Sequence, residues 1–272
     1  MKRAPRVFLL VVVAAAAAVA LAIRPPIPQP VDYHAFADAR TMYRIPNALN
    51  VLSNVPFAIV GWLGLAFLAR AQPRTAFASY RERPAYVLFF VGVFLTAFGS
   101  SYYHLAPSTE RLFWDRLPMS IAFMALFATV IAERIDVYWS RVLLLPLVFT
   151  GVASVVLWRL SEQAGHGDLR AYLFVQLFPM LALPMMMMLF EPHYTHSREL
   201  VVVVLLYACA KALEHFDVQV WNALDHKVSG HSLKHVVAAL ATYFVLDMLK
   251  RRAPRGDEDE AALEPSEEVD SA

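Results

Sequence analysis

Long runs of uncharged, apolar residues alternate with short polar segments along most of the chain. The hydrocarbon core of a bilayer is about 30 Å thick, so a helix that crosses it needs roughly 20 mainly apolar residues. Five runs approach or exceed that length, and two shorter ones are flanked on one side by ionisable residues that could extend the helix into a polar cavity. The seven predicted spans are residues 46–69, 84–103, 117–132, 142–158, 171–190, 200–210 and 236–246. An all-α, polytopic bundle of seven membrane helices is therefore expected.

An eighth apolar segment, residues 7–23, follows the basic start MKRAPR and is rich in alanine. Ala-Val-Ala and Ala-Leu-Ala triplets near its end would suit a signal peptidase, so residues 1–28 are either a signal anchor or a removed signal peptide. We favour a retained helix. Residues 29–250 would then form the membrane domain. Residues 251–272 are acidic and poor in large apolar side chains, which predicts a disordered cytoplasmic tail.

Composition and charge agree with an integral membrane protein. Hydrophobic residues make up 58% of the chain, and its formal net charge of +1 gives no indication of a nucleic-acid partner, so none is expected. When the amino terminus is placed inside and eight helices are threaded, most Lys and Arg residues fall on the inner side. The positive-inside rule therefore predicts that both termini are cytoplasmic. A single cysteine excludes a disulfide within the chain.

Polar residues interrupt the apolar runs at one membrane face. Helix 84–103 ends in FGSSYYH, the next helix begins after a short connector with FWDRLPM, and the last begins with GHSLKH. The predicted topology places all three segments at the non-cytoplasmic face. Because ionisable residues inside membrane helices are energetically costly, their gathering at one depth favours a functional role.

The residue types at this depth point to a metal. His231 and His235 lie four residues apart, so a helix presents both imidazoles on one face, and Ser100 and His104 share that spacing. Three imidazoles that leave a fourth position open are a common ligand set for catalytic zinc. We therefore predict that His104, His231 and His235 bind Zn²⁺. Asp115 would lie beside the metal, where it could accept a proton or orient a ligand.

Simpler interpretations exist for each feature taken alone. A single histidine at a membrane interface is usually an amphipathic residue at the headgroups, and HxxxH lacks the glutamate of HExxH proteases. Lys211, Glu214 and His215 either line a cavity or pair with one another. Lys234, between the two histidines of GHSLKH, is interpreted as a solvent-side neighbour.

The order and spacing of SSYYH, WDRLPM and HSLKH resemble the alkaline ceramidases. These enzymes belong to a membrane-hydrolase superfamily that includes the adiponectin and progestin receptor group. The resemblance covers roughly residues 32–249. The segment NALNVLSNVPF, residues 47–57, is also similar to the first ceramidase helix, which carries a like pattern of Asn and Ser-Asn.

The resemblance implies a seven-helix bundle with one zinc ion held by the three histidines. It also implies that Asp115 shuttles protons and that Ser100 helps to hold the zinc water or the oxyanion. The chain departs from the family before the first helix, where similar ceramidases hold calcium with an acidic loop that contains Trp-Cys-Glu. Here Asp32, Asp38 and Asn47 offer oxygen atoms at approximately matching places. Since calcium takes six or more oxygen ligands, Ca²⁺ is expected only as a second metal at an incomplete site.

The function expected from these features is that of a zinc-dependent membrane hydrolase acting on linear amide bonds. It would cleave a ceramide-like lipid into a fatty acid and a sphingoid base. One alternative is a zinc hydrolase of another lipid, because such a resemblance fixes a metal site better than a substrate. A second alternative is a receptor-like or transport protein with a structural zinc. No cysteine is placed to close such a site, although Asp115 could.

Overall fold

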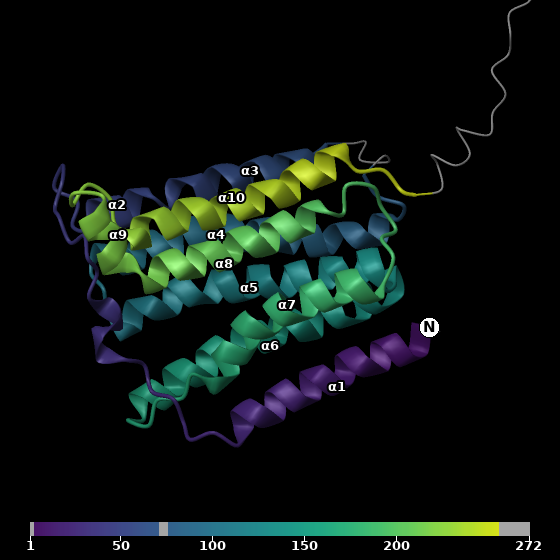
Figure 1. The fold of residues 1–272 in the computed structure, drawn as a ribbon, viewed down its shortest axis with the longest axis horizontal. Coiled ribbons are helices and arrows are strands. Elements are labelled where there is room, and N and C mark those ends of the chain that lie inside the picture. Colours follow the sequence, from purple (N-terminus) through teal and green to yellow (C-terminus); the bar gives the residue numbers. More distant parts are fainter. Residues whose placement is uncertain (1–2, 71–75, 256–272) are drawn as a thin grey trace, which may run out of the picture.

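The fold of residues 3–70 and 76–255, taken from a computed structural model, is built from helices that run roughly along one direction (Figure 1). Within these described residues there is no β-strand, apart from two isolated bridges. The predicted all-α class is therefore confirmed. The elements are α1 (Arg3–Ala22), η1 (Val31–His34), α2 (Ala48–Leu52), α3 (Val55–Ala69), η2 (Tyr80–Glu82), α4 (Arg83–Leu105), α5 (Thr109–Arg134), α6 (Val137–Gln163), α7 (Arg170–Leu189), α8 (Glu199–His215), α9 (Asp217–Ala223) and α10 (Gly230–Arg251).

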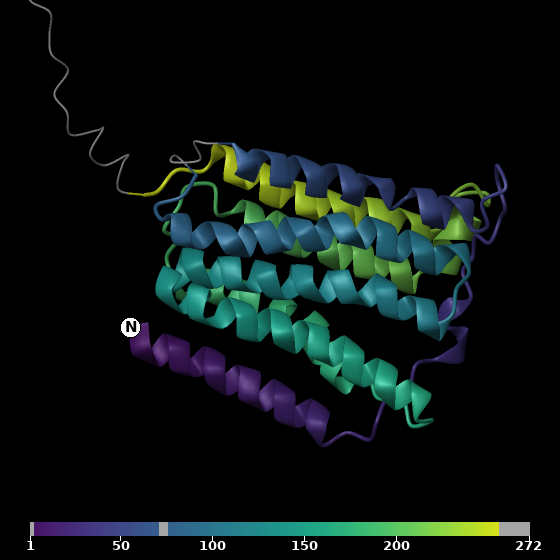
Figure 2. The same cartoon turned by 180° about the vertical axis from the view of Figure 1, so that it is seen from behind.

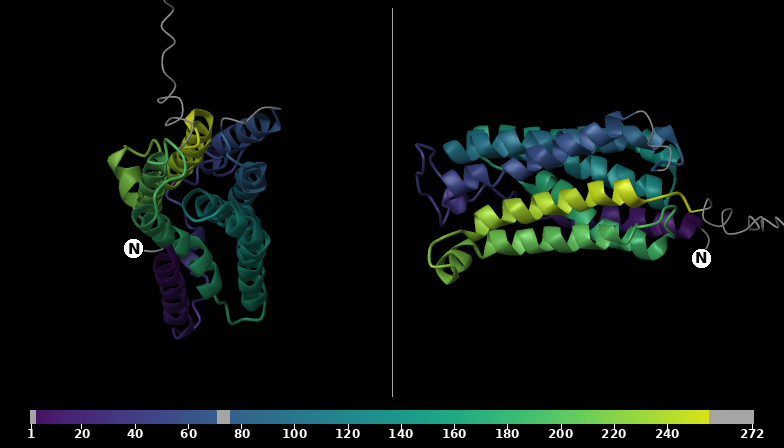
Figure 3. Two further views of the ribbon diagram at one scale, coloured as in Figure 1. Left: turned by 90° about the vertical axis from the view of Figure 1, so that its right-hand side faces the viewer. Right: turned by 90° about the horizontal axis from the view of Figure 1, so that it is seen from above.

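Seven helical stretches of the described chain are long and apolar enough to cross a membrane. They are α1, α2 with α3, η2 with α4, α5, α6, α7 and α10. Helix α8 has only 17 residues, yet it lies alongside α10 within the bundle (Figure 3). Large apolar side chains such as Leu145 and Phe149 are exposed on the outside of α6, where lipid rather than water would surround them. The chain is thus an integral, multi-pass membrane protein.

Several helices extend beyond the apolar runs that predicted them. Helices α5, α6 and α10 all begin in polar sequence, and a side-chain cap explains each start. Ser108, Asp136 and Ser229 each accept a hydrogen bond from a backbone N–H in the first turn of the helix that follows. The predicted helix 46–69 is instead divided into α2 and α3, with a break at residues 53–54.

Helix α1 lies at the edge of the bundle, against α7 (Figures 1 and 2). It is continuous over most of the predicted segment 7–23, and none of its residues is buried. The prediction of an apolar amino-terminal helix is therefore confirmed. Its retention or removal, and the side of the membrane on which it begins, stay predictions.

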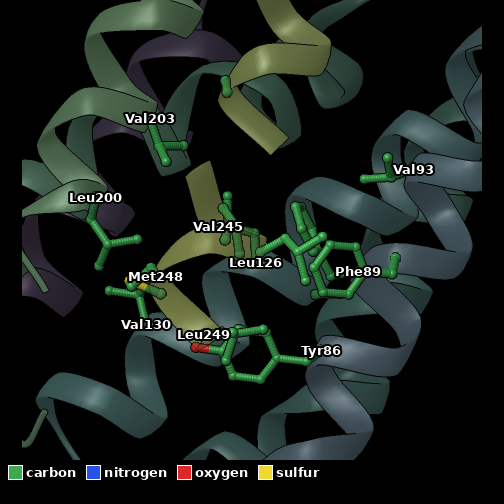
Figure 4. Packing of buried hydrophobic residues seen from close by; sticks show 14 of the residues in the cluster. Tyr86, Phe89, Val93, Leu126, Val130, Leu200, Val203, Val245, Met248 and Leu249 are labelled. Carbon is green, nitrogen blue, oxygen red and sulfur yellow. The ribbon is translucent and has the colours of Figure 1, made fainter. Parts of the chain in front are cut away.

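The central packing is formed by α4, α5, α8 and α10 (Figure 4). Tyr86 and Phe89 of α4 lie against Leu126 of α5 and Val245 of α10, and all four are nearly inaccessible to solvent. Lipid tails are as apolar as leucine, so burying these groups gains little from excluding water. Close packing and hydrogen bonds between the helices must hold the bundle together.

The chain after α10 packs back onto the bundle. The backbone N–H of Ala253 donates to Thr195 Oγ1 at 3.0 Å, and the N–H of Arg255 donates to the carbonyl of His193 at 2.9 Å. The prediction that disorder begins at residue 251 was therefore wrong for residues 251–255. The remainder of the predicted tail, residues 256–272, lies outside the described residues.

Arg252 explains why this segment is ordered. Its guanidinium is buried and paired with Glu133, and the carboxylate of Glu82 lies 3.9 Å away as a second partner of opposite charge. It also donates to the hydroxyl of Tyr86 at 2.9 Å. Tyr194 in turn donates to Glu82 at 2.6 Å. A polar network therefore joins the end of α10 to α4, α5 and the loop before α8.

Candidate metal centre

Three imidazoles meet where α4 ends and α10 begins. The start of α10 lies at the end of the bundle opposite to the start of α1 (Figure 1). His104 lies in the last turn of α4, and His231 and His235 lie in the first two turns of α10. Their exposed fractions are only 1%, 5% and 5%. Ring nitrogens of the three side chains all lie within 4.8 Å of one another. The histidines that the sequence predicted to converge therefore do so, although His104 and His231 are 127 residues apart in the chain.

The spacing of the nitrogens fits a metal ion. A tetrahedral zinc with Zn–N bonds of about 2.0–2.1 Å would place two ligand nitrogens about 3.3–3.4 Å apart. The Nε2 atoms of His104 and His231 are 3.3 Å apart. No carboxylate or thiol among the described residues joins this group. The cluster could therefore hold a metal ion, and a set of three imidazoles is compatible with zinc.

Ser53 fixes the ring of His235. Its hydroxyl lies 2.8 Å from Nδ1 of that imidazole, at the break between α2 and α3. This leaves Nε2 of His235 to face the other two rings. An outer hydrogen bond of this kind sets the tautomer and orientation of a metal-binding histidine.

The start of α10 is held by the loop that precedes α2. Asp217, at the start of α9, accepts hydrogen bonds from the backbone N–H of His231 at 2.7 Å and of Ala37 at 2.9 Å. The ring of Phe36 packs against His231 and His104, with centroid distances of 4.4 and 4.8 Å. The loop thus covers the imidazoles with an aromatic ring.

Two glycines let the helices of the site approach closely. A Cβ atom added to Gly99 of α4 would lie 2.1 Å from the carbonyl oxygen of Trp114 in α5. One added to Gly230, the first residue of α10, would lie 2.3 Å from the carbonyl oxygen of Leu213 in α8. Real Cβ contacts are never this short, so both helix pairs depend on the missing side chain at these positions.

Ser100 of α4 and Asp115 of α5 face the same cavity, at the contact between these two helices. Together with His235, they line a cavity of about 400 Å³. Its deeper wall is apolar and includes Phe89 and Val245. His235 and Val245 are ten positions apart on α10, or about 15 Å along the helix axis. The cavity therefore runs from a polar end beside the imidazoles into the apolar middle of the bundle.

Charged residues of α8 and α10 also line this cavity. Glu214 pairs with Lys211 and, at 2.5 Å, with Lys234. Lys234 was interpreted as a solvent-side neighbour, but that was wrong, because its side chain is only 17% exposed and turns toward Glu214 of the adjacent helix. The Tyr33 hydroxyl donates to Glu214 at 3.4 Å. Burial raises the pKa of Tyr33, so it stays a neutral donor.

The predicted calcium ligands do not form a suitable site. Both carboxylate oxygens of Asp38 accept hydrogen bonds from the guanidinium of Arg40 at 2.8 Å, so this carboxylate already has a cation. Asn47 turns its amide nitrogen to the carbonyl of His104, 2.9 Å away. Asp32 lies exposed in η1. These residues do not offer the oxygen-rich shell that calcium needs.

Sequence reasoning missed the residues that act across helices. Ser53 lies in the segment NALNVLSNVPF, whose pattern of Asn and Ser-Asn does not indicate a hydrogen bond to His235. Asp217 and Phe36 lie in segments where no apolar pattern or motif marks them. Their contacts depend on how the helices are arranged around the bundle.

Comparison with known proteins adds no family. No protein-family model matches the chain, and no curated protein matches it. The resemblance to alkaline ceramidases therefore depends on three short motifs and stays a prediction.

Proposed function

We propose that the protein is a zinc-dependent amidase that hydrolyses ceramide-like lipids within the membrane. The observation that carries this proposal is the position of the three imidazoles at the polar end of an apolar cavity, beside a carboxylate and a hydroxyl. Such a site presents a metal and a proton acceptor to a lipid whose chain stays out of water. The resemblance of SSYYH, WDRLPM and HSLKH to ceramidase motifs supports ceramide as the substrate class.

The bound zinc would polarise the amide carbonyl and make water a better nucleophile near neutral pH. The chain's own groups would move the protons. Asp115 would take one proton from the attacking water and deliver it to the amide nitrogen as the C–N bond breaks. The products are then a carboxylic acid and an amine, which balances the reaction. Ser100 would donate a hydrogen bond to the carbonyl oxygen as negative charge develops, an effect worth about 3 kcal/mol in other hydrolases.

The acyl chain would occupy the deeper, apolar part of the cavity. Its walls are formed by α3, α4, α5, α7, α8 and α10, so an acyl chain inside it would lie among helices and out of water. A soluble amide would gain nothing from these walls. The shape and chemistry of the cavity therefore favour a lipid over a small polar substrate.

The test combines metal content with hydrolysis. Purified protein is assayed for bound zinc and for release of fatty acid from ceramide, with an ester lipid of the same acyl chain in parallel. His231→Ala should lose zinc and activity together, whereas His215→Ala, an exposed histidine outside the cavity, should retain both. A folded His231→Ala protein that keeps its zinc and hydrolyses ceramide normally would overturn the assignment. Activity on the ester alone would replace ceramide with another lipid.

Asp115→Asn separates a catalytic zinc from a structural one. If Asp115 moves protons, the variant keeps its zinc and loses hydrolysis. If the variant instead loses zinc as well, Asp115 is the fourth ligand and the site is closed, as in a structural centre.

A further inference from the structure

Arg116 follows Asp115 on α5 and is only 5% exposed. Its guanidinium lies over three aromatic rings, those of Trp158, Tyr172 and Tyr33, at 4.3, 4.6 and 5.4 Å from their centroids. Ring faces attract cations, so this cage holds the guanidinium in place. It does not neutralise the charge.

No carboxylate of the described residues forms an ion pair with Arg116, and its Nη1 atom is buried without a hydrogen-bond partner. Arg252 provides an internal comparison. It also lies among three aromatic rings, but there Glu133 and Glu82 supply the negative charge. The cage of Arg116 is thus built like that of Arg252 except for the anion.

A second unsatisfied group lies beside this cage. Gln29 is 8% exposed, and both polar atoms of its side-chain amide lack a hydrogen-bond partner in the described structure. Its backbone N–H is held by Glu162 at 2.8 Å, and the same oxygen accepts from the indole N–H of Trp158 at 3.0 Å. Glu162 thus joins the backbone of Gln29 to Trp158, a ring of the cage, while the side-chain amide of Gln29 has no partner. Arg116 and Gln29 line one cavity.

That cavity is the one that reaches the imidazoles. Its ionisable lining beyond the histidine comprises three cations and two carboxylates, namely Arg116, Lys211, Lys234, Asp115 and Glu214. Both lysines are already paired with Glu214. The three cations exceed the two carboxylates by one charge, and Arg116 is the cation of this lining for which no ion pair is found among the described residues. A metal ion at the histidines would add to the positive field.

We propose that Arg116 and Gln29 bind an anionic group, a carboxylate or a phosphate, on the amine side of the lipid amide. The inference rests on the proposed function and narrows its substrate class from neutral ceramides to anionic acyl amides. A guanidinium binds either group through two parallel hydrogen bonds, and the amide of Gln29 adds a further donor. With the anion held at the cage and the acyl chain in the apolar end, the amide bond would lie between them, near the histidines.

The experiment compares lipids that share one acyl chain. Full-length protein is assayed with N-palmitoylglycine, N-palmitoylsphingosine phosphate and neutral N-palmitoylsphingosine, which separates a carboxylate from a phosphate. Arg116→Gln should lower the ratio of kcat/KM for the preferred anionic lipid over the neutral lipid by about tenfold to a hundredfold, the usual value of hydrogen bonds to a charged group. Gln29→Leu should lower the same ratio less. Arg111→Gln is the matched control, because Arg111 is on the same helix and stacks on Tyr102 at 4.4 Å but does not line the cavity.

A binding measurement keeps the two proposals distinguishable. Palmityl phosphate, but not palmityl alcohol, should raise the Tm of the wild type and of Arg111→Gln, and the rise should vanish in Arg116→Gln. If Arg116→Gln and Gln29→Leu hydrolyse lipid amides with zinc and keep the lipid preference of the wild type, the anion site is refuted and the amidase proposal is retained. If palmityl phosphate raises the Tm only when Arg116 is present, but no amide is hydrolysed, the amidase proposal is refuted and the anion site is retained.

Discussion

Ser53→Ala should weaken metal binding without touching a metal ligand. The hydroxyl lies 2.8 Å from Nδ1 of His235, whose imidazole is buried. Without it, a nearly buried imidazole nitrogen loses its partner, which costs about 1–3 kcal/mol. The ring would also lose the contact that turns Nε2 toward the other histidines. Outer-shell hydrogen bonds of this kind are worth about 10- to 100-fold in metal affinity, which is the range expected here.

The affinity is measured by competition with a chromophoric zinc chelator. Ser101→Ala is the control. Ser101 of α4 also makes a hydrogen bond to another helix, but to the backbone carbonyl of Val51 in α2, at 3.3 Å, rather than to an imidazole. Ser101→Ala should bind zinc as the wild type does. If Ser53→Ala bound zinc with unchanged affinity, the ring orientation in this structure would not be the metal-binding one, and the assignment of Nε2 would have to be abandoned.

Three further outcomes follow from other contacts. Glu133→Gln should lower the free energy of unfolding by about 3 kcal/mol, because Arg252 would lose its closest charge partner in a buried network; unfolding in detergent measures this, and a loss below 1 kcal/mol would contradict it. Gly99→Ala should lower the free energy of unfolding by about 1–3 kcal/mol, because the added methyl group would force α4 away from α5. It should also lower the rate of lipid hydrolysis, since Ser100 would move away from Asp115. A stability equal to that of the wild type would show that the two helices separate freely. Added Ca²⁺ should leave the Tm unchanged, since Arg40 occupies the carboxylate of Asp38; a rise that Asp38→Asn removes would restore the calcium site.

The helices could be predicted well because a membrane imposes one strong pattern. Each transmembrane helix needs a long apolar run, and such runs are visible without knowledge of the partners. The ends were predicted less well. Polar first turns carry no apolar signal, and the starts of α5 and α10 depend on the caps Ser108 and Ser229. These caps are single residues in a sequence with many other serines.

The imidazole cluster was predictable because two constraints act together. Spacing along α10 puts His231 and His235 on one face, and the number of crossings puts His104 at the same depth. Depth does not give the order of helices around the bundle. That order decides that Ser53 faces His235 and that Lys234 turns to Glu214, so neither contact could be derived from the sequence.

The two arginine cages show which buried groups stability can account for. A buried charge that lacks a partner is destabilising by several kcal/mol, and an apolar side chain of similar volume would usually pack at lower cost. For Arg252, two carboxylates of the protein offset this cost and also fix the end of α10. The guanidinium of Arg116 contacts ring faces, which attract a cation more weakly than a carboxylate does. Packing alone therefore does not explain an arginine at position 116. An anionic ligand that completes the cage does, and it would do so in the same cavity that brings a lipid to the histidines.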